Sequence, residues 1–574
     1  MPSPRETYAA RHAEREAAAR RHDRRDAWLG NARLAVFVVG GGLAWACWRF
    51  AWSYWLLAAP AALFLALIIV HAAARRARDR ARRAVDYYAR GLARIDEKWR
   101  GHGDPGDRFA DPHHLYAADL DLFGAGSVYE LLCHAGTVAG RETLAAWLKA
   151  PADVAAVRGR QAAARDLAER LDLREDLALR ADDVGTELQP ERLRAWVAAP
   201  AALRRGWRRA LALATSTLSG AALIGWAVGL GPRPLVVMIV VVLVVNRLTK
   251  TAVAKVVGPI EARARNLDAL AHVLARVERE RFTAPRLEEQ RAALGAGGRP
   301  ASAQIERLGR LVALLDSGRN QLVAIFAGLV LWDLHCAYAL EAWRLGAGAH
   351  IGRWLEGLGE IEALALLGAY AYEHPDDQFP ELTEVAPRFA AEGLGHPLLP
   401  AATCVRNDVA LDAQPRVLIV SGSNMSGKST LLRSVGVATV LGLTGAPVRA
   451  RRLTLSPLGV GATLRIQDSL GEGVSRFYAE IVRLREIVER AKGAPPLLFL
   501  IDEMLGGTNS HDRRIGAEAV IVSLAERGAI GLVTTHDLAL ADITASLGAR
   551  AANVHFEDQL DGGRIAFDYT MRPG

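Results

Sequence analysis

The stretch SGSNMSGKST, residues 421–430, has the residue types and spacing of a phosphate-binding loop. It fits the pattern Gly-x-x-x-x-Gly-Lys-Ser, and the apolar run 417–420 before it predicts a strand that leads into the loop. Glycines let backbone N–H groups close around phosphate oxygens, and the helix that follows adds the positive end of its dipole. The residues expected to bind the phosphates of a nucleotide are Gly422, Ser423, Asn424, Met425, Ser426, Gly427, Lys428, Ser429 and Thr430.

Two further predicted strands end in groups that suit nucleotide hydrolysis. We expect Lys428 to contact the β- and γ-phosphates as a catalytic residue and the Ser429 hydroxyl to bind Mg²⁺. Asp502 follows the apolar run 497–501, where a P-loop fold places its second Mg²⁺ ligand, and Glu503 is then positioned to polarise the attacking water.

His536 follows another apolar run, 530–535, and is expected to sense the γ-phosphate. Taken alone, it would be an ordinary loop histidine, and Asp502-Glu503 would be two solvated acids at a strand end. The presence of three such elements in one chain favours the catalytic interpretation.

The elements that must position these residues differ between two parts of the chain. After residue 415, short apolar runs alternate with helical stretches, which is typical of a parallel α/β sheet. Upstream, 115–200 and 258–320 are rich in Ala, Leu, Arg and Glu with apolar residues at helical spacing. The sequence therefore predicts an all-helical domain followed by an α/β domain.

The N-terminal region contains an apolar block, 34–70, that a single charge, Arg49, divides into two runs. Each run is close to the length that spans a bilayer, aromatic residues cluster at the division, and Arg-rich segments flank the block. These features predict a transmembrane hairpin with both ends in the cytoplasm. The alternative is a buried helical hairpin in a soluble core.

A second pair of apolar runs, 210–230 and 234–245, is also flanked by basic residues and predicts a second transmembrane hairpin. The apolar stretch 320–340 contains Asp333 and His335, and a buried helix of the soluble part is expected there.

The formal charge of +8 suggests an anionic partner, but the Arg-rich flanks of the apolar blocks account for much of it. The four cysteines are far apart and show no metal-ligand spacing, so neither a zinc site nor a disulfide framework is expected. No signal peptide is expected either, since the first apolar run follows roughly thirty polar and charged residues.

Together these motifs resemble the MutS-type ATPases of DNA mismatch repair. The phosphate loop of that family carries an Asn-Met pair, as Asn424-Met425 does here. A weaker resemblance to the family's helical core begins in 120–151, and the resemblance as a whole covers roughly 115–200 and 258–574. The other matching positions are His396-Pro397, Asn407, Asp502-Glu503, Gly507-Thr508, Thr534-Thr535-His536 and the closing stretch 555–574.

The resemblance implies ATP as the nucleotide, Mg²⁺ as its metal, and double-stranded DNA, mismatched or branched, as a partner. The stretch 468–477, DSLGEGVSRF, resembles the family's signature loop, in which a serine reaches the nucleotide of the partner subunit. This places Ser475 in a composite site and implies a homodimer. Cys404 stands where the resemblance leads us to expect an aromatic residue that stacks on adenine.

The predicted fold class is multidomain α and α/β, and the mismatch-recognition and connector domains of repair MutS are expected to be missing. The predicted parts are a basic cytoplasmic N-terminus at 1–33, a transmembrane hairpin at 34–71, a basic linker at 72–114, an all-α MutS-like core (lever) at 115–395 interrupted by a second transmembrane hairpin at about 210–246, and an α/β P-loop ATPase with an ABC-like parallel sheet at 396–574.

The predicted function is a membrane-anchored MutS-family ATPase that couples ATP hydrolysis to DNA binding. It is expected in the cell inner membrane, with the lipid bilayer as a partner and the ATPase domain in the cytoplasm. One alternative is an ATP-driven membrane switch that acts on protein partners without DNA. An ABC-type transporter is disfavoured because no LSGGQ-like signature precedes Asp502 and the apolar segments lack buried charges that would mark a route.

Overall fold

The computed structural model of the protein describes residues 2–185, 188–203, 206–260, 264–295, 298–319, 323–385, 387–465, 476–505, 510–536, 543–561 and 564–574. The chain divides into two compact units. The first contains 1–103 and 372–374, and the second contains 104–371 and 375–574.

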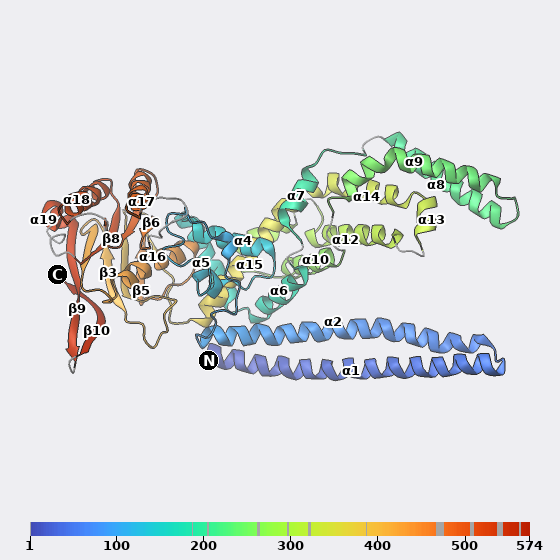
Figure 1. Cartoon of the computed structure of the whole chain (residues 1–574), viewed down its shortest axis with the longest axis horizontal. Coiled ribbons are helices and arrows are strands. Elements are labelled where there is room, and N and C mark those ends of the chain that lie inside the picture. Colours follow the sequence, from blue (N-terminus) through green and yellow to red (C-terminus); the bar gives the residue numbers. More distant parts are fainter. Residues whose placement is uncertain are drawn as a thin grey trace. The chain divides into compact units, whose positions relative to one another are not determined.

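The first unit is dominated by an antiparallel hairpin of two long helices, α1 (Pro4–Phe50) and α2 (Ala58–Ile95), joined through η1 (Tyr54–Leu57) (Figure 1). Ser3 starts α1 with a capping box, in which its side chain and that of Glu6 bond each other's backbone N–H. Both helices run without a break through residues 33 and 71. The basic and apolar segments predicted from the sequence are therefore parts of the same two helices.

The apolar end of this hairpin is exposed: Phe37 is 67% and Trp55 86% accessible. Among the described residues, four helices are long and apolar enough to cross a membrane, at Pro4–Phe50, Tyr54–Ile95, Arg209–Ala227 and Arg233–Val257. Exposed apolar helices of this length are not typical of a soluble core.

The second unit begins with a helical part. Its α10 has a strongly apolar face that packs between α6 and α12, and a continuous apolar core includes Trp196, Trp343 and Trp354. The elements of this part are η2 (Asp107–Phe109), α3 (Val128–Leu132), α4 (Val138–Lys149), α5 (Val154–Ala168), α6 (Leu171–Val184), α7 (Pro190–Ala198), α8 (Gly206–Ala227), α9 (Arg233–Val257), α10 (Ala264–Glu278), α11 (Pro285–Leu294), α12 (Ala301–Gly318), α13 (Ala324–Leu329), α14 (Trp332–Gly346), η3 (Gly348–His350) and α15 (Ile351–Glu373).

The apolar stretch 320–340 differs from the single buried helix expected there. The chain breaks at Leu331, whose φ of 51° is left-handed, so that α13 and α14 are separate helices. Residues of α14 such as Leu334 and Leu340 are buried, whereas Phe326 of α13 is 58% exposed. Only the second half of the stretch is therefore a buried helix.

The C-terminal part of the second unit contains two sheets. A small sheet has the order β1-β5-β2-β3, with β1 (Glu381–Leu382), β5 (Arg452–Leu455), β2 (Phe389–Leu394) and β3 (Asn407–Leu411). It thus includes strands on both sides of residue 396. The main sheet has the order β10-β9-β4-β8-β7-β6, with β10 (Arg564–Pro573), β9 (Ala551–Asp561), β4 (Val417–Ser421), β8 (Ile530–Thr535), β7 (Leu497–Ile501) and β6 (Gly459–Thr463).

Helices cover both faces of the main sheet. Phe499 and the strand residues on its face pack against apolar residues of α17 (Arg476–Arg490), α18 (Ser510–Glu526) and α19 (Ile543–Leu547), which η5 (Gly548–Arg550) follows. Leu500 points to the other face, where it meets Gly436 of α16 (Lys428–Thr444). In the main sheet all pairings except β9–β10 are parallel, so β4, β8 and β7 end side by side at one edge.

A buried carboxyl group links α15 to α4 within the helical part. Glu362 is 4% exposed, and it accepts hydrogen bonds from the backbone N–H and the hydroxyl of Thr137, the N-cap residue of α4. Gly140 leaves the space that this approach needs, because a Cβ there would lie 2.7 Å from a carboxyl oxygen of Glu362. Burial raises the pKa of Glu362 from its ordinary value of 4.5 to about 7.

This raised pKa predicts a pH-dependent stability. Between pH 4.5 and about 7 the folded state keeps a proton on Glu362 that the unfolded state has lost, so stability falls as pH rises through this window, by about 3 kcal/mol in total. The Glu362→Gln variant, which cannot titrate, is expected to lose this part of the pH dependence. Hydrogen exchange of α4 and α15 amides at pH 5 to 8 measures it; identical pH profiles for variant and wild type would contradict the prediction.

Candidate functional site

The predicted phosphate-binding loop connects β4 to α16 at the edge where the parallel strands end. Its sharp course depends on left-handed backbone at Gly422 and Gly427, with φ of 147° and 103°. A Cβ on Gly422 would lie 3.1 Å from the carbonyl oxygen of Phe556, so a larger residue would push the loop away from β9. Lys428 opens α16, which aims the helix N-terminus at the loop.

The Lys428 side chain lies within the loop and is 4% exposed. Its Nζ donates to the carbonyl oxygens of Gly422, at 2.8 Å, and Ser423, at 2.6 Å. A cation held inside a ring of backbone groups at a helix N-terminus suits an anion with several oxygens, such as a di- or triphosphate.

Ser429 and Asp502 meet across the sheet edge, as the sequence predicts. The Ser429 hydroxyl donates to Oδ2 of Asp502 at 2.6 Å. Thr534, at the end of β8 between them, donates to the other carboxyl oxygen of Asp502 and accepts from the backbone N–H of Glu503 at 3.1 Å. One hydroxyl thus fixes both acidic residues. Thr534 is a positioning residue; in the sequence it is part of the Thr534-Thr535-His536 resemblance, from which no role for it was predicted.

Glu503 and His536 form the outer part of the site. The Glu503 backbone has a φ of 48°, a left-handed conformation that only a strained turn imposes on this residue type. Its carboxyl group lies 3.5 Å from Nδ1 of His536, and both side chains are about half exposed. The predicted water-activating acid and the predicted γ-phosphate sensor are therefore neighbours, accessible to a ligand in the loop.

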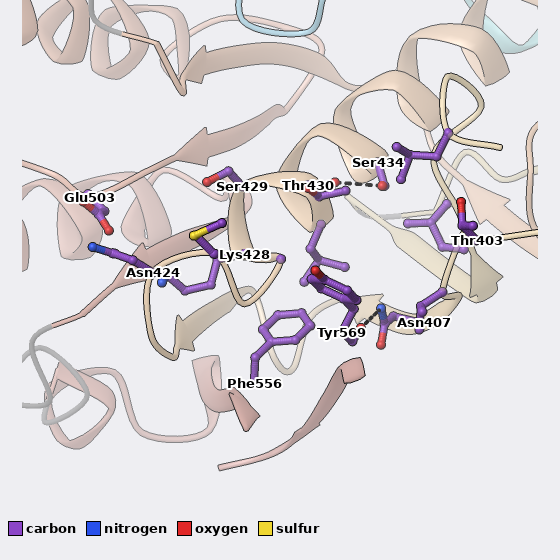
Figure 2. A pocket seen from close by; sticks show the side chains of 16 residues that line it. Thr403, Asn407, Asn424, Lys428, Ser429, Thr430, Ser434, Glu503, Phe556 and Tyr569 are labelled. Atoms are coloured by element: carbon purple, nitrogen blue, oxygen red, sulfur yellow. Dashed lines mark hydrogen bonds between the residues drawn. The ribbon is translucent and has the colours of Figure 1, made fainter. Parts of the chain in front are cut away.

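A cavity of about 510 Å³ opens beside the loop (Figure 2). Asn424, Met425, Lys428, Ser429, Thr430 and Glu503 line one end, and the other end is lined by residues from the small sheet and from β9 and β10. Figure 2 shows Tyr569 and Phe556 bordering the cavity near Lys428, with Asn407 beyond Tyr569. This volume, with charged side chains of the loop and two aromatic rings close to them, suits a nucleotide.

Cys404, the position where an aromatic residue was expected, does not line this cavity, whereas the rings of Phe556 and Tyr569 do. The register of β9 and β10 shifts between Phe567 and Met571, and Tyr569 lies in the resulting bulge with a φ of 53°. Asn407 holds the bulge: its Nδ2 donates to the Tyr569 carbonyl at 3.0 Å, and its Oδ1 accepts from the Met571 N–H at 2.7 Å. The ring lies close enough to Gly427 that a Cβ there would be 3.1 Å from it.

Replacing Tyr569 with Ala is expected to weaken ATP binding about 10-fold, since stacking of a base on an aromatic ring contributes about 1–3 kcal/mol. Tyr569→Phe, which keeps the ring and the same backbone preference, is the matched control and should bind like wild type. Equilibrium titration with a fluorescent ATP analogue measures both. Equal affinity of the Ala variant and wild type would remove Tyr569 from the base site.

A buried acid of the helical part contacts the chain just after β6. Asp119 is 4% exposed and accepts from the backbone N–H groups of Leu464, at 2.7 Å, and Arg465, at 2.9 Å, just after β6. The Arg465 side chain forms a two-pronged ion pair with Asp121. This contact fixes the chain directly before 466–475, which contains the predicted signature residue Ser475. Ser475 itself lies outside the described residues, as do Gly507 and Thr508.

The part of the chain that contains this site is similar in sequence to known proteins. Residues 418–574 match the family model for MutS domain V. The chain is 41% identical over 142 residues, 25% of its length, to Endonuclease MutS2 of Thermus thermophilus, and this match covers 18% of that protein. It is 31% identical over 222 residues to the DNA mismatch repair protein MutS of Natronomonas pharaonis and 31% over 227 residues to that of Methanosarcina acetivorans, covering 38% of the chain and 25% of each relative.

The matched region thus spans at most a quarter of the length of these relatives. The matches support a relationship to MutS proteins, and the domain V match includes the loop, both acidic residues and Tyr569.

Proposed function

We propose that this protein is a membrane-anchored MutS-type ATPase that binds and hydrolyses ATP and couples the cycle to DNA binding. The observation that carries the proposal is the hydrogen-bonded array of Ser429, Asp502 and Thr534 beside Lys428. Lys428, Ser429 and Glu503 line one nucleotide-sized cavity, and Asp502 is hydrogen-bonded to Ser429, which supports the proposal.

Magnesium fits the residues present. The Ser429 hydroxyl and the Asp502 carboxylate are hard oxygen donors 2.6 Å apart, and Mg²⁺ takes one or two such protein ligands together with water and phosphate oxygens. When bound, the ion neutralises charge on the phosphates. In the described part of the chain, no group of three or more His, Cys, Asp or Glu side chains is arranged so that it could hold a metal ion.

In the proposed reaction, the adenine lies against Tyr569 and the triphosphate follows the loop to Lys428. Lys428 Nζ moves from loop carbonyls to the β- and γ-phosphate oxygens. Glu503 accepts a proton from a water molecule, whose oxygen forms a bond to the γ-phosphorus while the bond to the β,γ-bridging oxygen breaks. His536, 3.5 Å from Glu503, orients that carboxylate and contacts the γ-phosphate.

Ser475 and a second copy of the chain complete the proposed site. Asp119 bonds the backbone at 464–465, and in the proposed cycle this contact couples the helical part to the stretch that contains Ser475. In a homodimer, Ser475 would contact the nucleotide of the partner subunit. This gives the ATP cycle a physical connection to the helical part, where DNA would be held.

The DNA part of the proposal rests on the relatives, whose names state mismatch repair and endonuclease functions. It is tested by titrating the purified protein in nanodiscs against branched, mismatched and fully paired duplexes, with and without ATP. We expect nucleotide-dependent affinity and a steep decrease with salt. Absence of binding at low salt while ATP hydrolysis is intact would reject DNA as the partner, and would favour a membrane switch that acts on proteins.

The membrane part rests on the four exposed apolar helices. Both hairpins would cross the inner membrane, with the ATPase domain in the cytoplasm. Reporter fusions at Gly231, in the turn between α8 and α9, and at Gly574 test this topology. The first should report the outside and the second the cytoplasm; two cytoplasmic reports would exclude a spanning second hairpin.

A further inference from the structure

The short helix α13 presents an uncovered apolar surface. Val323 is 42% and Phe326 58% exposed, and residues 323–331, VAIFAGLVL, contain no charged side chain. Charged, exposed residues flank this run on both sides: Asp316 and Arg319 precede it and Asp333 follows it. A soluble helical bundle has no physical reason to place such a segment at its tip.

A hydrogen bond links the chain at the break after α13 to the middle of α8. The Ser216 hydroxyl donates to the carbonyl oxygen of Val330 at 2.7 Å and lies 2.9 Å from Nε2 of His335. That carbonyl belongs to the turn where the helix is interrupted, so the hydroxyl supplies a hydrogen bond next to the break. Both α13 and α14 pack against α8 and α9 (Figure 1).

The position of Ser216 along α8 sets the depth of α13. Arg209 and Arg233 are the charged residues at the start of the hairpin and at its turn. Ser216 lies seven residues beyond Arg209, about 10 Å along the helix. If the two arginines lie at opposite surfaces of a hydrocarbon layer about 30 Å thick, Ser216 is inside that layer.

Exposed leucines on α8 indicate the same depth for Ser216 in the hydrocarbon layer. Leu213 and Leu218, one on each side of Ser216 in the sequence, are 50% and 58% exposed. The uncovered apolar surface of the hairpin therefore does not stop where α13 packs, but continues past it toward Arg209. A layer that ended beyond α13 would leave these leucines in water.

We propose that α13 is a re-entrant helix that enters the hydrocarbon layer beside α8 and α9, from the side that holds both ends of that hairpin, and presents Val323 and Phe326 to lipid acyl chains. The inference rests on the proposed membrane insertion of α8 and α9. Interrupted backbone is tolerated at membrane depth where protein groups satisfy it, which is the role of Ser216 at Val330. The flanking charges at Asp316, Arg319 and Asp333 limit the apolar segment that inserts to residues 323–331.

Depth-dependent fluorescence quenching tests this proposal. A solvent-sensitive dye is attached to single cysteines introduced at Phe326, at Ile224 in the outer half of α8, and at the exposed Glu306 of α12. The background carries Cys404→Ser, because the other three native cysteines are buried. Each variant is reconstituted in phosphatidylcholine–phosphatidylglycerol nanodiscs containing nitroxide-labelled acyl chains, after a check that it binds ATP like wild type.

We expect the dyes at Phe326 and Ile224 to lose fluorescence to a comparable extent, and the dye at Glu306 to be unaffected. Quenching at Ile224 without quenching at Phe326 would overturn the re-entrant helix and leave the membrane hairpin standing. Absence of quenching at both positions would overturn the proposed membrane insertion itself, and the re-entrant helix with it.

Discussion

The Glu503→Gln variant is expected to bind ATP as wild type does and to hydrolyse it at least about 100-fold more slowly, the usual effect of losing a general base. The amide has the shape of the carboxylate, so the turn at Glu503 and its backbone hydrogen bond to Thr534 are retained. What is lost is the group that we propose to accept the proton of the attacking water. The side chain is exposed and next to His536, so the substitution leaves no buried charge unpaired.

Single-turnover hydrolysis and ATP titration, measured on the same preparation, separate the chemical step from binding. Glu526→Gln, an exposed position at the end of α18, is the matched control and should change neither quantity. A Glu503→Gln variant with wild-type turnover would show that another group activates the water. Loss of ATP binding in this variant would show that the substitution disturbs the site itself.

The second large effect, a loss of local stability, is expected at the end of the N-terminal hairpin where α1 begins and α2 ends. Arg94 of α2 and Glu373 form a two-pronged ion pair at 2.7 and 2.6 Å, in which the Arg94 side chain is 9% and the Glu373 side chain 1% exposed. The Tyr8 hydroxyl adds a hydrogen bond at 3.3 Å, and the Tyr8 ring stacks on Tyr372. This cluster ties both helices of the hairpin to Tyr372 and Glu373, which belong to the same unit.

Arg94→Met keeps most of the side-chain volume and leaves the Glu373 carboxylate buried without its cation. Breaking a buried pair in this way costs about 3–5 kcal/mol. Hydrogen exchange of amides in the last turns of α2 should therefore accelerate by a factor of roughly 100 or more. The double variant Arg94→Met, Glu373→Leu removes both charges and is expected to recover most of the protection.

Arg90→Met, an exposed position one turn earlier on α2, is the control and should exchange like wild type. A double variant as unprotected as Arg94→Met would mean that packing, and not the unpaired carboxylate, causes the loss.

The chemical centre of the site was predictable because its residues lie at ends of short, recognisable strands. Lys428, Ser429, Asp502 and Glu503 each follow an apolar run, and parallel strands bring such ends to one edge of a sheet. The Asn424-Met425 pair then indicated a particular family, and the match of 418–574 to MutS domain V agrees with it.

Tyr569 could not be placed in the site from the sequence, although it belongs to the matched closing stretch. Its position depends on a bulge between two long strands and on hydrogen bonds from Asn407, more than 160 residues earlier. The same limit applies to Asp119, whose partners are backbone N–H groups near residue 464. Local patterns do not encode such long-range contacts.

The apolar segments show a related limit of prediction from the sequence. Length and flanking charge identify α8 and α9 as candidate spans, and the structure leaves them exposed. For 320–340, composition alone does not reveal that the helix breaks at Leu331, since the nearest glycine, Gly328, lies inside α13 and Leu331 itself is a good helix former. The break depends on packing against α8, where Ser216 bonds the Val330 carbonyl.

The central claim, that the loop is the site of an ATPase, is tested most directly by the steady-state rate of phosphate release from ATP, measured on the protein in nanodiscs with Mg²⁺ or with excess chelator. Lys428→Ala is measured beside wild type. The account predicts Mg²⁺-dependent release by wild type and a loss to background in Lys428→Ala, whose removed Nζ is the cation held inside the loop. Release at the wild-type rate by Lys428→Ala, or release that persists without Mg²⁺, would contradict it.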